Sequence, residues 1–134
     1  MNKRIVTHLS YEIMGCAIRV HRELGPGLLE SIYKHCMLHE MELKGFSVYH
    51  EQFIPIFYRG VEMSAKLRAD MVVNDLVVVE IKAVETILPI HEAQLHTYMK
   101  LLKVPQGLLI NFNTENISRS GKPIVNEIFR SLPD

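Results

Sequence analysis

The chain has 134 residues, 48% hydrophobic and 22% charged, which suits one compact globular domain over residues 1–134 and excludes a disordered polymer. Fifteen basic residues balance fifteen acidic ones, which is not the charge signature of a protein that coats nucleic acid. The apolar runs are shorter than the roughly 20 residues of a membrane-spanning helix. The first residues have a basic start but no long apolar segment or small-residue cleavage site, so we expect no signal peptide. Because both cysteines fall at apolar positions of predicted helices, we expect reduced thiols and a cytoplasmic location.

The first elements are two helices. Apolar residues recur with a helical period over residues 10–24, with Ser10 as the expected N-cap, and Gly-Pro-Gly at 25–27 ends this helix. A second helix is predicted over residues 28–44, and Gly45 follows as its stop. On this second helix His35, Cys36 and His39 lie close together, but zinc would need further ligands, so we favour packing and surface roles.

From residue 46 the apolar period changes to two, which is typical of strands. Pro55 marks an edge or a break, and Asn74-Asp75 are turn residues. The predicted strands of this meander are 46–58, 61–73 and 77–84. In each of the last two, alternate residues point to opposite faces, so that one face builds the core and the other is polar.

Pro89 opens a third helix, at a first-turn position where its missing N–H costs little. A short apolar strand follows over residues 107–112, then a polar loop over 113–123 and a last strand over 124–130. The order of two helices, a strand meander, a helix and closing strands predicts an α/β fold, a mixed β-sheet flanked by helices.

Two charged residues interrupt the apolar stretch "VVVEIKAV", and they suggest a site. Glu80 and Lys82 share one face of the predicted strand, and Asp70 lies on the preceding strand. A two-residue turn would pair Asp70 with Val79 and point Glu80 away. An odd-numbered or bulged connection at 74–76 would instead place Asp70 opposite Glu80. The site hypothesis therefore requires that odd connection.

If the two carboxylates face each other, their repulsion is unfavourable, and a divalent cation between them would relieve it. Oxygen ligands suit Mg²⁺ or Mn²⁺, which take one or two carboxylates together with waters and phosphate. Lys82 could then lower the pKa of an attacking water or stabilise a charged transition state. From the spacing alone, a solvated Glu80–Lys82 pair with Asp70 near a turn explains the residues equally well.

Three motifs in order resemble a known family. Asp70, nine residues and then Glu80-Ile81-Lys82 resemble the active site of the PD-(D/E)XK nuclease superfamily, although Ala69 stands where the strict motif has proline. Gly27-x-x-Glu30-x-x-Tyr33 and Gln94-x-x-x-Tyr98 resemble the motifs of its small GxxExxY branch. The resemblance covers nearly the whole chain and implies a restriction-endonuclease-like core.

The resemblance also implies roles for single residues. Asp70 and Glu80 would bind the metal with the main-chain carbonyl of Ile81, Lys82 would be the catalytic lysine, and Glu30 would reach the metal shell. Gln94 and Tyr98 share a helix face and would contact a phosphate or orient Lys82. Without the resemblance, Glu30 is an acid near a helix N-terminus, Tyr98 packs in the core and Gln94 lies on the surface.

Two basic residues extend the predicted site. Lys66 and Arg68 share the strand face of Asp70 and would contact the backbone of a substrate. We therefore expect Mg²⁺- or Mn²⁺-dependent hydrolysis of a phosphodiester, in DNA first of all, with no membrane partner. The alternative is a non-catalytic binding module of the same fold that docks to a protein or nucleic acid, which the neutral charge and small size favour. A homodimer with a shared groove is compatible with either.

Overall fold

The computed structural model describes the backbone of residues 1–134 and all side chains except those of residues 65 and 66. Within the described chain, five strands form one mixed sheet in the order β1-β2-β3-β4-β5. Only β3 and β4 run parallel; the other neighbours are antiparallel. The strands are β1 (Val48–Tyr58), β2 (Val61–Val73), β3 (Val77–Lys82), β4 (Gln106–Asn111) and β5 (Lys122–Val125).

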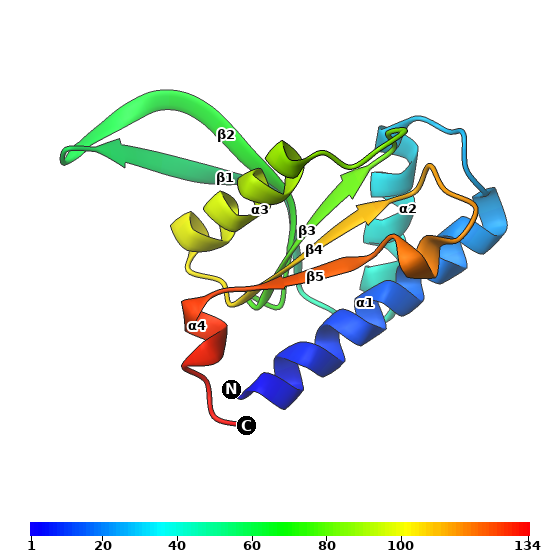
Figure 1. The fold of residues 1–134 in the computed structure, drawn as a ribbon, viewed down its shortest axis with the longest axis horizontal. Coiled ribbons are helices and arrows are strands. Elements are labelled where there is room, and N and C mark those ends of the chain that lie inside the picture. Colours follow the sequence, from blue (N-terminus) through cyan, green and yellow to red (C-terminus); the bar gives the residue numbers. More distant parts are fainter.

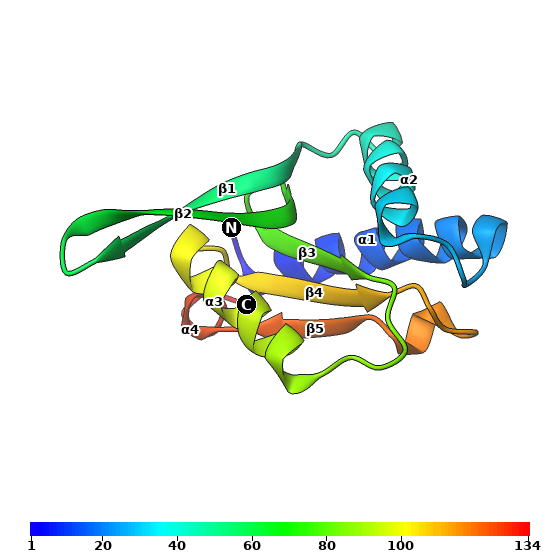
Figure 2. The same ribbon diagram turned by 90° about the horizontal axis from the view of Figure 1, so that it is seen from above.

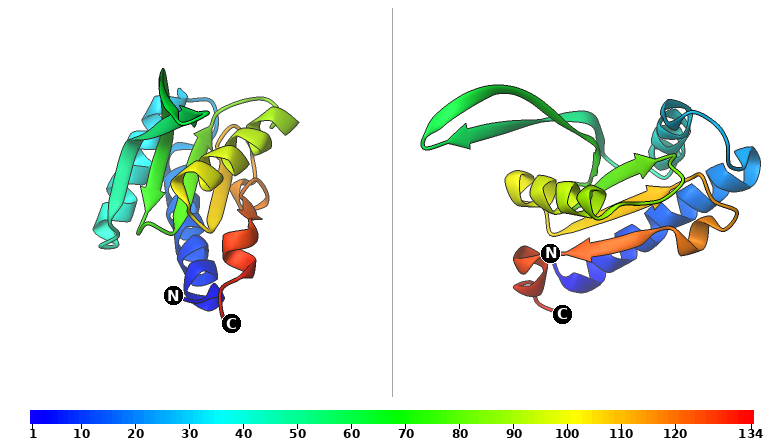
Figure 3. Two further views of the ribbon diagram at one scale, coloured as in Figure 1. Left: turned by 90° about the vertical axis from the view of Figure 1, so that its left-hand side faces the viewer. Right: turned by 45° about the horizontal axis from the view of Figure 1, so that its top comes forward.

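Helices cover both faces of this sheet, so the expected α/β fold with a mixed, helix-flanked sheet is confirmed (Figures 2 and 3). On one face, α1 (Lys3–Leu24) and α2 (Glu30–Leu43) bury an apolar cluster against β2, β3 and β4. On the other face, α3 (Pro89–Leu102) packs through Leu95 and Met99 against a second cluster. Two short helices, η1 (Ile117–Arg119) and α4 (Glu127–Arg130), flank β5.

The first helix starts earlier than its sequence pattern suggested. It begins at Lys3, and the side chain of Asn2 caps it by accepting the N–H of Ile5 at 2.8 Å. Val6 and Leu9 extend the buried apolar stripe toward the N-terminus, and their burial stabilises the additional turns of the helix. The N-cap prediction for Ser10 is therefore wrong: this residue is buried inside the helix, and its hydroxyl donates to the Thr7 carbonyl.

The chain also departs from the prediction of a strand over residues 124–130. The strand β5 ends at Val125, and Asn126 turns the chain by capping α4, with its side chain accepting the N–H of Phe129 at 3.1 Å. The Asn126 side chain also donates to the carbonyl of Val104 at 2.9 Å, which ties this end of the chain to the segment before β4.

Both faces of β3 are buried, which corrects the expectation of one core face and one polar face. Val77, Val79 and Ile81 belong to the cluster under α1 and α2, whereas Val78 belongs to the cluster under α3. This burial on both faces fits a central strand with a parallel neighbour. The polar positions are limited to the end of β3, which stops at Lys82 rather than at residue 84.

The long hairpin of β1 and β2 projects from the body of the molecule (Figure 1). Near its base, the pairing of β2 with β3 reaches only from Val73–Val77 to Met71–Val79. Beyond that point β2 leaves β3, and Glu51 on β1 adopts a left-handed φ of 51° opposite this place. The alternation of faces also changes here, because Ala69 packs under α3 and Met71 under α2. The strands therefore fork at Asp70.

No helix among the described residues is long and apolar enough to cross a membrane.

Candidate functional site

The connection between β2 and β3 has the form that the site hypothesis required. It consists of residues 74–76, an odd number, because Val73 pairs with Val77. Asn74 and Asp75 both adopt positive φ values, 51° and 57°, which their short polar side chains tolerate, and the N–H of Leu76 donates to the Val73 carbonyl at 2.9 Å. Continuing this register by one step brings Asp70 opposite Glu80.

The two carboxylates take the place of main-chain pairing at the fork. The N–H of Asp70 donates to Oε1 of Glu80 at 3.1 Å, and the N–H of Ile81 donates to Oδ2 of Asp70 at 2.8 Å. Each side chain thus accepts a hydrogen bond from the main chain of the opposite strand. These hydrogen bonds fix both side chains in position, and the main chain of Ile81 lies beside them.

Glu80 is a buried acid with a strongly altered affinity for protons. It is 7% exposed. Burial, followed by the neighbouring charge of Asp70, raises the pKa of Glu80 to about 8, although the charge of Lys82 acts in the opposite direction. Two carboxylates held this closely in a poorly solvated place repel each other when both are ionised. The arrangement can be relieved by a proton or by a cation.

Lys34 on α2 connects Glu30 to this pair. Its Nζ lies 2.9 Å from Oδ1 of Asp70 and 3.3 Å from Oε2 of Glu30. Burial lowers the pKa of Lys34, but the hydrogen bonds and charges of Asp70 and Glu30 outweigh burial, so the pKa is raised above its ordinary value. Sequence reasoning missed Lys34. The available signal was its position four residues after Glu30, on the same helix face.

The residues around Glu30 explain its position at the start of α2. Tyr33 is fully buried; its hydroxyl donates to the Gly25 carbonyl at 2.6 Å and accepts the N–H of Leu28 at 3.1 Å. Its ring stacks on Phe112, with ring centroids 4.6 Å apart. Gly27 has a φ of 103°, which favours glycine. The hydrogen bonds of Tyr33 therefore hold the loop before α2 in place, and with it the position of Glu30 at the start of the helix.

The downstream helix α3 contributes Tyr98 to the surroundings of the acids. Burial, followed by the charges of Glu80 and Asp70, raises the pKa of Tyr98. The same side chain packs against the cluster under α3. Gln94 lies one turn earlier on this helix and is exposed. The charges of both acids thus act on Tyr98, whereas Gln94 faces solvent.

The basic residues predicted at the site are separated by the fork. Lys82 is half-buried at the end of β3, where its charge lowers the pKa of Glu80. Arg68 is exposed on the hairpin, and its Nη1 contacts the main-chain carbonyl of Glu51 at 3.4 Å rather than the acids. The prediction for Lys66 lies outside the described side chains.

Asn111 at the end of β4 is a second polar residue that the sequence did not single out. It is buried, and its side chain accepts the N–H of Val84 at 3.0 Å and donates to the carbonyl of Val84 at 2.8 Å. Asn111 also pairs with Lys82 across the parallel strands. These contacts hold the chain that follows Lys82, so Asn111 helps to fix the direction in which this lysine leaves the sheet.

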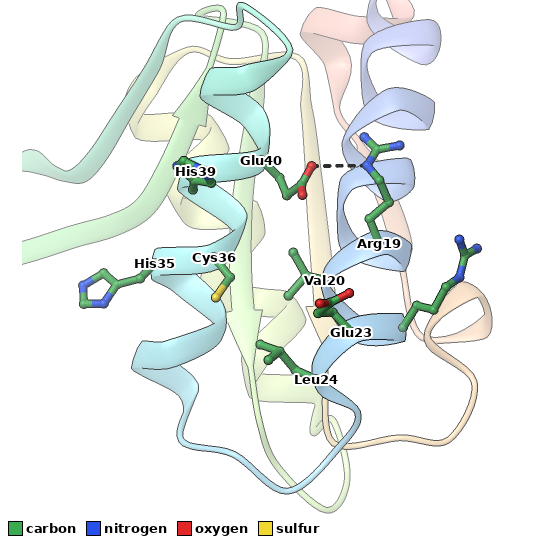
Figure 4. A pocket seen from close by; sticks show the side chains of 9 residues that line it. Arg19, Val20, Glu23, Leu24, His35, Cys36, His39 and Glu40 are labelled. Carbon is green, nitrogen blue, oxygen red and sulfur yellow. Dashed lines mark hydrogen bonds and ion pairs between the residues drawn. The ribbon is translucent and has the colours of Figure 1, made fainter.

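A cavity of about 590 Å³ lies elsewhere, between α1 and α2 (Figure 4). His35, Cys36 and His39 line it from α2, and Arg19 reaches Glu40 across it at 3.2 Å. In the described part of the chain, no group of three or more His, Cys, Asp or Glu residues could hold a metal ion. That statement applies both to this cavity and to the acids at the fork.

The donor set at the fork fits a metal that keeps most of its water. Asp70 and Glu80 supply two carboxylates, which is the usual number for Mg²⁺ bound together with waters and phosphate oxygens. Glu30 is joined to them through the Lys34 ammonium. The carboxyl end of β3, which carries Glu80 and Lys82, lies beside α2, which carries Glu30 (Figure 1).

Comparison with known protein families gives a match over most of the chain. The model of a family described as the PD-(D/E)XK nuclease superfamily matches residues 7–123, a stretch that includes every residue discussed at the fork. A search of curated proteins and a search of solved structures each found no match.

Proposed function

Because the chain belongs to the PD-(D/E)XK nuclease superfamily, we propose that it hydrolyses phosphodiester bonds in nucleic acid with the help of Mg²⁺ or Mn²⁺, and that DNA is the substrate to test first. One observation carries the proposal: two carboxylates from neighbouring strands, one of them buried, meet at the fork, and Lys82 ends the same strand as Glu80. A fold by itself does not give a function, so the proposal rests on this site.

The chain's own residues would divide the work as follows. Asp70 and Glu80 would hold the cation together with the main-chain carbonyl of Ile81. The hydrogen bonds between the strands support this, because they fix both carboxylates beside the main chain of Ile81. A divalent cation bound there would supply a water of lowered pKa and polarise the phosphoryl oxygen. The Lys82 ammonium would face the charge that develops on the phosphate.

Other residues would support binding. Glu30 would reach the metal shell directly or through water. Tyr98 and Gln94 on α3 would contact a phosphate of the substrate. Lys66 and Arg68 on the hairpin would contact the sugar-phosphate backbone of the nucleic acid, further from the cleaved bond. The motif around Glu30 and Tyr33 supports placement in the GxxExxY branch, a proposal finer than the superfamily itself. We extend the proposal to a single domain over residues 1–134.

The test is a cleavage assay with the purified protein. Labelled single- and double-stranded DNA and RNA are incubated with Mn²⁺, Mg²⁺ or EDTA, beside the variants Glu80→Ala and Lys82→Ala. Exposed Glu85 and Lys100 provide the control variants Glu85→Ala and Lys100→Ala. The proposal expects cleavage in metal, none in EDTA, loss in both site variants and retention in both controls. Cleavage that persists in Glu80→Ala and Lys82→Ala would contradict it.

A second candidate function is a non-catalytic binding module of the same fold. The balance of fifteen basic and fifteen acidic residues in a chain of only 134 favours it, because little of the surface can select a substrate. This candidate expects nucleic-acid or protein binding that is indifferent to Asp70→Ala and to EDTA. Loss of divalent-metal binding in Asp70→Ala would instead favour the nuclease.

A further inference from the structure

Lys34 makes two contacts that place it in the middle of the proposed site rather than on the surface. Its ammonium lies between Asp70 on β2 and Glu30 on α2, at 2.9 and 3.3 Å. The side chain of Lys34 is 25% exposed and that of Asp70 is 11% exposed, so solvent screens this pair less than an open surface pair. The contact with Asp70 joins α2 to β2, which are distant in sequence. A lysine that pairs only within its own helix makes no such link.

The position of this ammonium conflicts with a divalent cation on the same carboxylate. Oδ2 of Asp70 accepts the N–H of Ile81, and Oδ1 is the oxygen that Lys34 contacts. A cation that takes Oδ1 as a ligand would stand a few ångströms from the lysine nitrogen. Positive charges this close repel each other strongly where water is scarce. Lysine has a flexible four-carbon stem, so the side chain can withdraw.

Resting on the proposed function, we propose that Lys34 is a built-in competitor of the metal: it neutralises Asp70 and Glu30 in the metal-free protein and must give way when the cation binds. Lys34 is thus a positioning residue that acts through Asp70 and does not touch the substrate. Two consequences follow. Lys34 keeps the acids in place before the metal arrives, and it makes the intrinsic affinity for metal weaker than the carboxylates alone would give.

The first test is a calorimetric titration of the whole protein with Mn²⁺, without nucleic acid. We expect Lys34→Met to bind Mn²⁺ at least about tenfold more tightly than the wild type, because a repelling unit charge is removed. Lys34→Arg keeps the charge and should stay within about twofold of the wild type. Lys3→Met is the matched control: it also removes a lysine from an ion pair, with Asp134 at the chain ends, 3.5 Å away.

The outcomes separate this inference from the proposed function. Unchanged or weaker Mn²⁺ binding in Lys34→Met, with binding in the wild type, overturns the role of Lys34 and leaves the metal site standing. No binding in either protein overturns both. If Lys34→Met does not fold, Lys34→Gln, which keeps hydrogen-bonding capacity without the charge, is expected to show the same tighter binding, and unchanged affinity in it overturns the inference.

A second readout excludes a merely structural lysine. In EDTA, Lys34→Met should unfold at a lower temperature than Lys3→Met, because Asp70 and Glu30 lose their counter-charge. In saturating Mn²⁺ this gap should close, since the metal replaces the missing cation. A gap of equal size with and without Mn²⁺ would mean that Lys34 only holds the fold together, and would overturn the inference.

Discussion

Replacing Glu80 by glutamine should remove a large pH dependence of stability. Burial and the charge of Asp70 raise the pKa of Glu80 to about 8, from an ordinary value of 4.5. Between these two values the folded protein holds a proton that the unfolded chain releases. The stability that this group contributes is therefore fully present below pH 4.5 and is lost as the pH rises through 8.

The size of the effect follows from the shift. Each unit of difference in pKa corresponds to about 1.4 kcal/mol, so raising the pH from 5 to 8 should cost the wild type about 2 to 4 kcal/mol through this one group. Glutamine has nearly the same shape and carries no charge. Its side-chain oxygen can still accept the N–H of Asp70, which Glu80 accepts at 3.1 Å. Glu80→Gln should therefore match the wild type at pH 5 and exceed it at pH 8 to 9.

The assay is urea unfolding followed by circular dichroism, in EDTA, at several pH values from 5 to 9. Exposed Glu85 supplies the control, because Glu85→Gln changes the same charge outside the site and should run parallel to the wild type. Mn²⁺ added at pH 8 should stabilise the wild type more than Glu80→Gln, since it binds the ionised pair. Equal pH dependence in the wild type and Glu80→Gln would refute the reasoning.

The remaining predictions concern the hydrogen bonds of Tyr33 and the packing at Gly107 and Gly15. Tyr33→Phe keeps the stack on Phe112 but leaves the Gly25 carbonyl and the Leu28 N–H without their partner. Urea unfolding should therefore show that the free energy of unfolding falls by about 1 to 3 kcal/mol. The control Tyr58→Phe, on the exposed hairpin tip, should show little change. Gly107→Ala should destabilise by about 1 to 3 kcal/mol, because a Cβ would lie 2.8 Å from Leu95 Cγ. Gly15→Ala in α1, where nothing lies within 4 Å of the added Cβ, should instead stabilise the protein by about 0.5 to 1 kcal/mol. Thermal unfolding measures both variants, and a lower melting temperature for Gly107→Ala alone supports the close packing of α3 on the sheet.

From the sequence, Asp70 and Glu80 could be predicted to face each other only if the turn between their strands had an odd number of residues. Alternation along 61–73 and 77–84 placed Asp70 and Glu80 on facing strands, but whether they met depended on the length of the turn. Leu76 is apolar and could equally have begun the next strand, so the pattern did not choose between an even and an odd connection. In the folded chain Val73 pairs with Val77, and Leu76 stays in the turn with its N–H donating to the Val73 carbonyl, so the connection has three residues.

Contacts between distant elements were beyond the reach of the sequence. Lys34 could be paired with Glu30 from helix spacing, but its stronger contact is with Asp70 on β2, which depends on how α2 lies against the fork. Arg68 shares strand parity with Asp70, yet the change of faces at the fork turns it toward Glu51. Val78 alternates with the core residues and is nevertheless buried, because α3 covers the second face of the sheet.

At two helix boundaries, the prediction was wrong because it relied on the local preference of single residue types. Ser10 has the right residue type for an N-cap, but the buried stripe continues upstream of it to Val6, and tertiary packing decided the start of α1. Asn126 lies inside a stretch with strand-like residues and caps a short helix instead. Pro89 was placed correctly, because a proline at a first-turn position is both a stop for the preceding chain and a favourable start for the helix.

The central claim is that Asp70 and Glu80 together form a divalent-metal site, and calorimetric titration with Mn²⁺ tests it most directly. The wild type, Asp70→Asn and Asp75→Asn are compared at pH 8; Asp75 lies in the exposed turn of the same hairpin, and asparagine tolerates its positive φ of 57°. We expect binding at one site in the wild type and in Asp75→Asn, and loss of binding in Asp70→Asn. Equal Mn²⁺ binding by all three proteins, or by none, would contradict it.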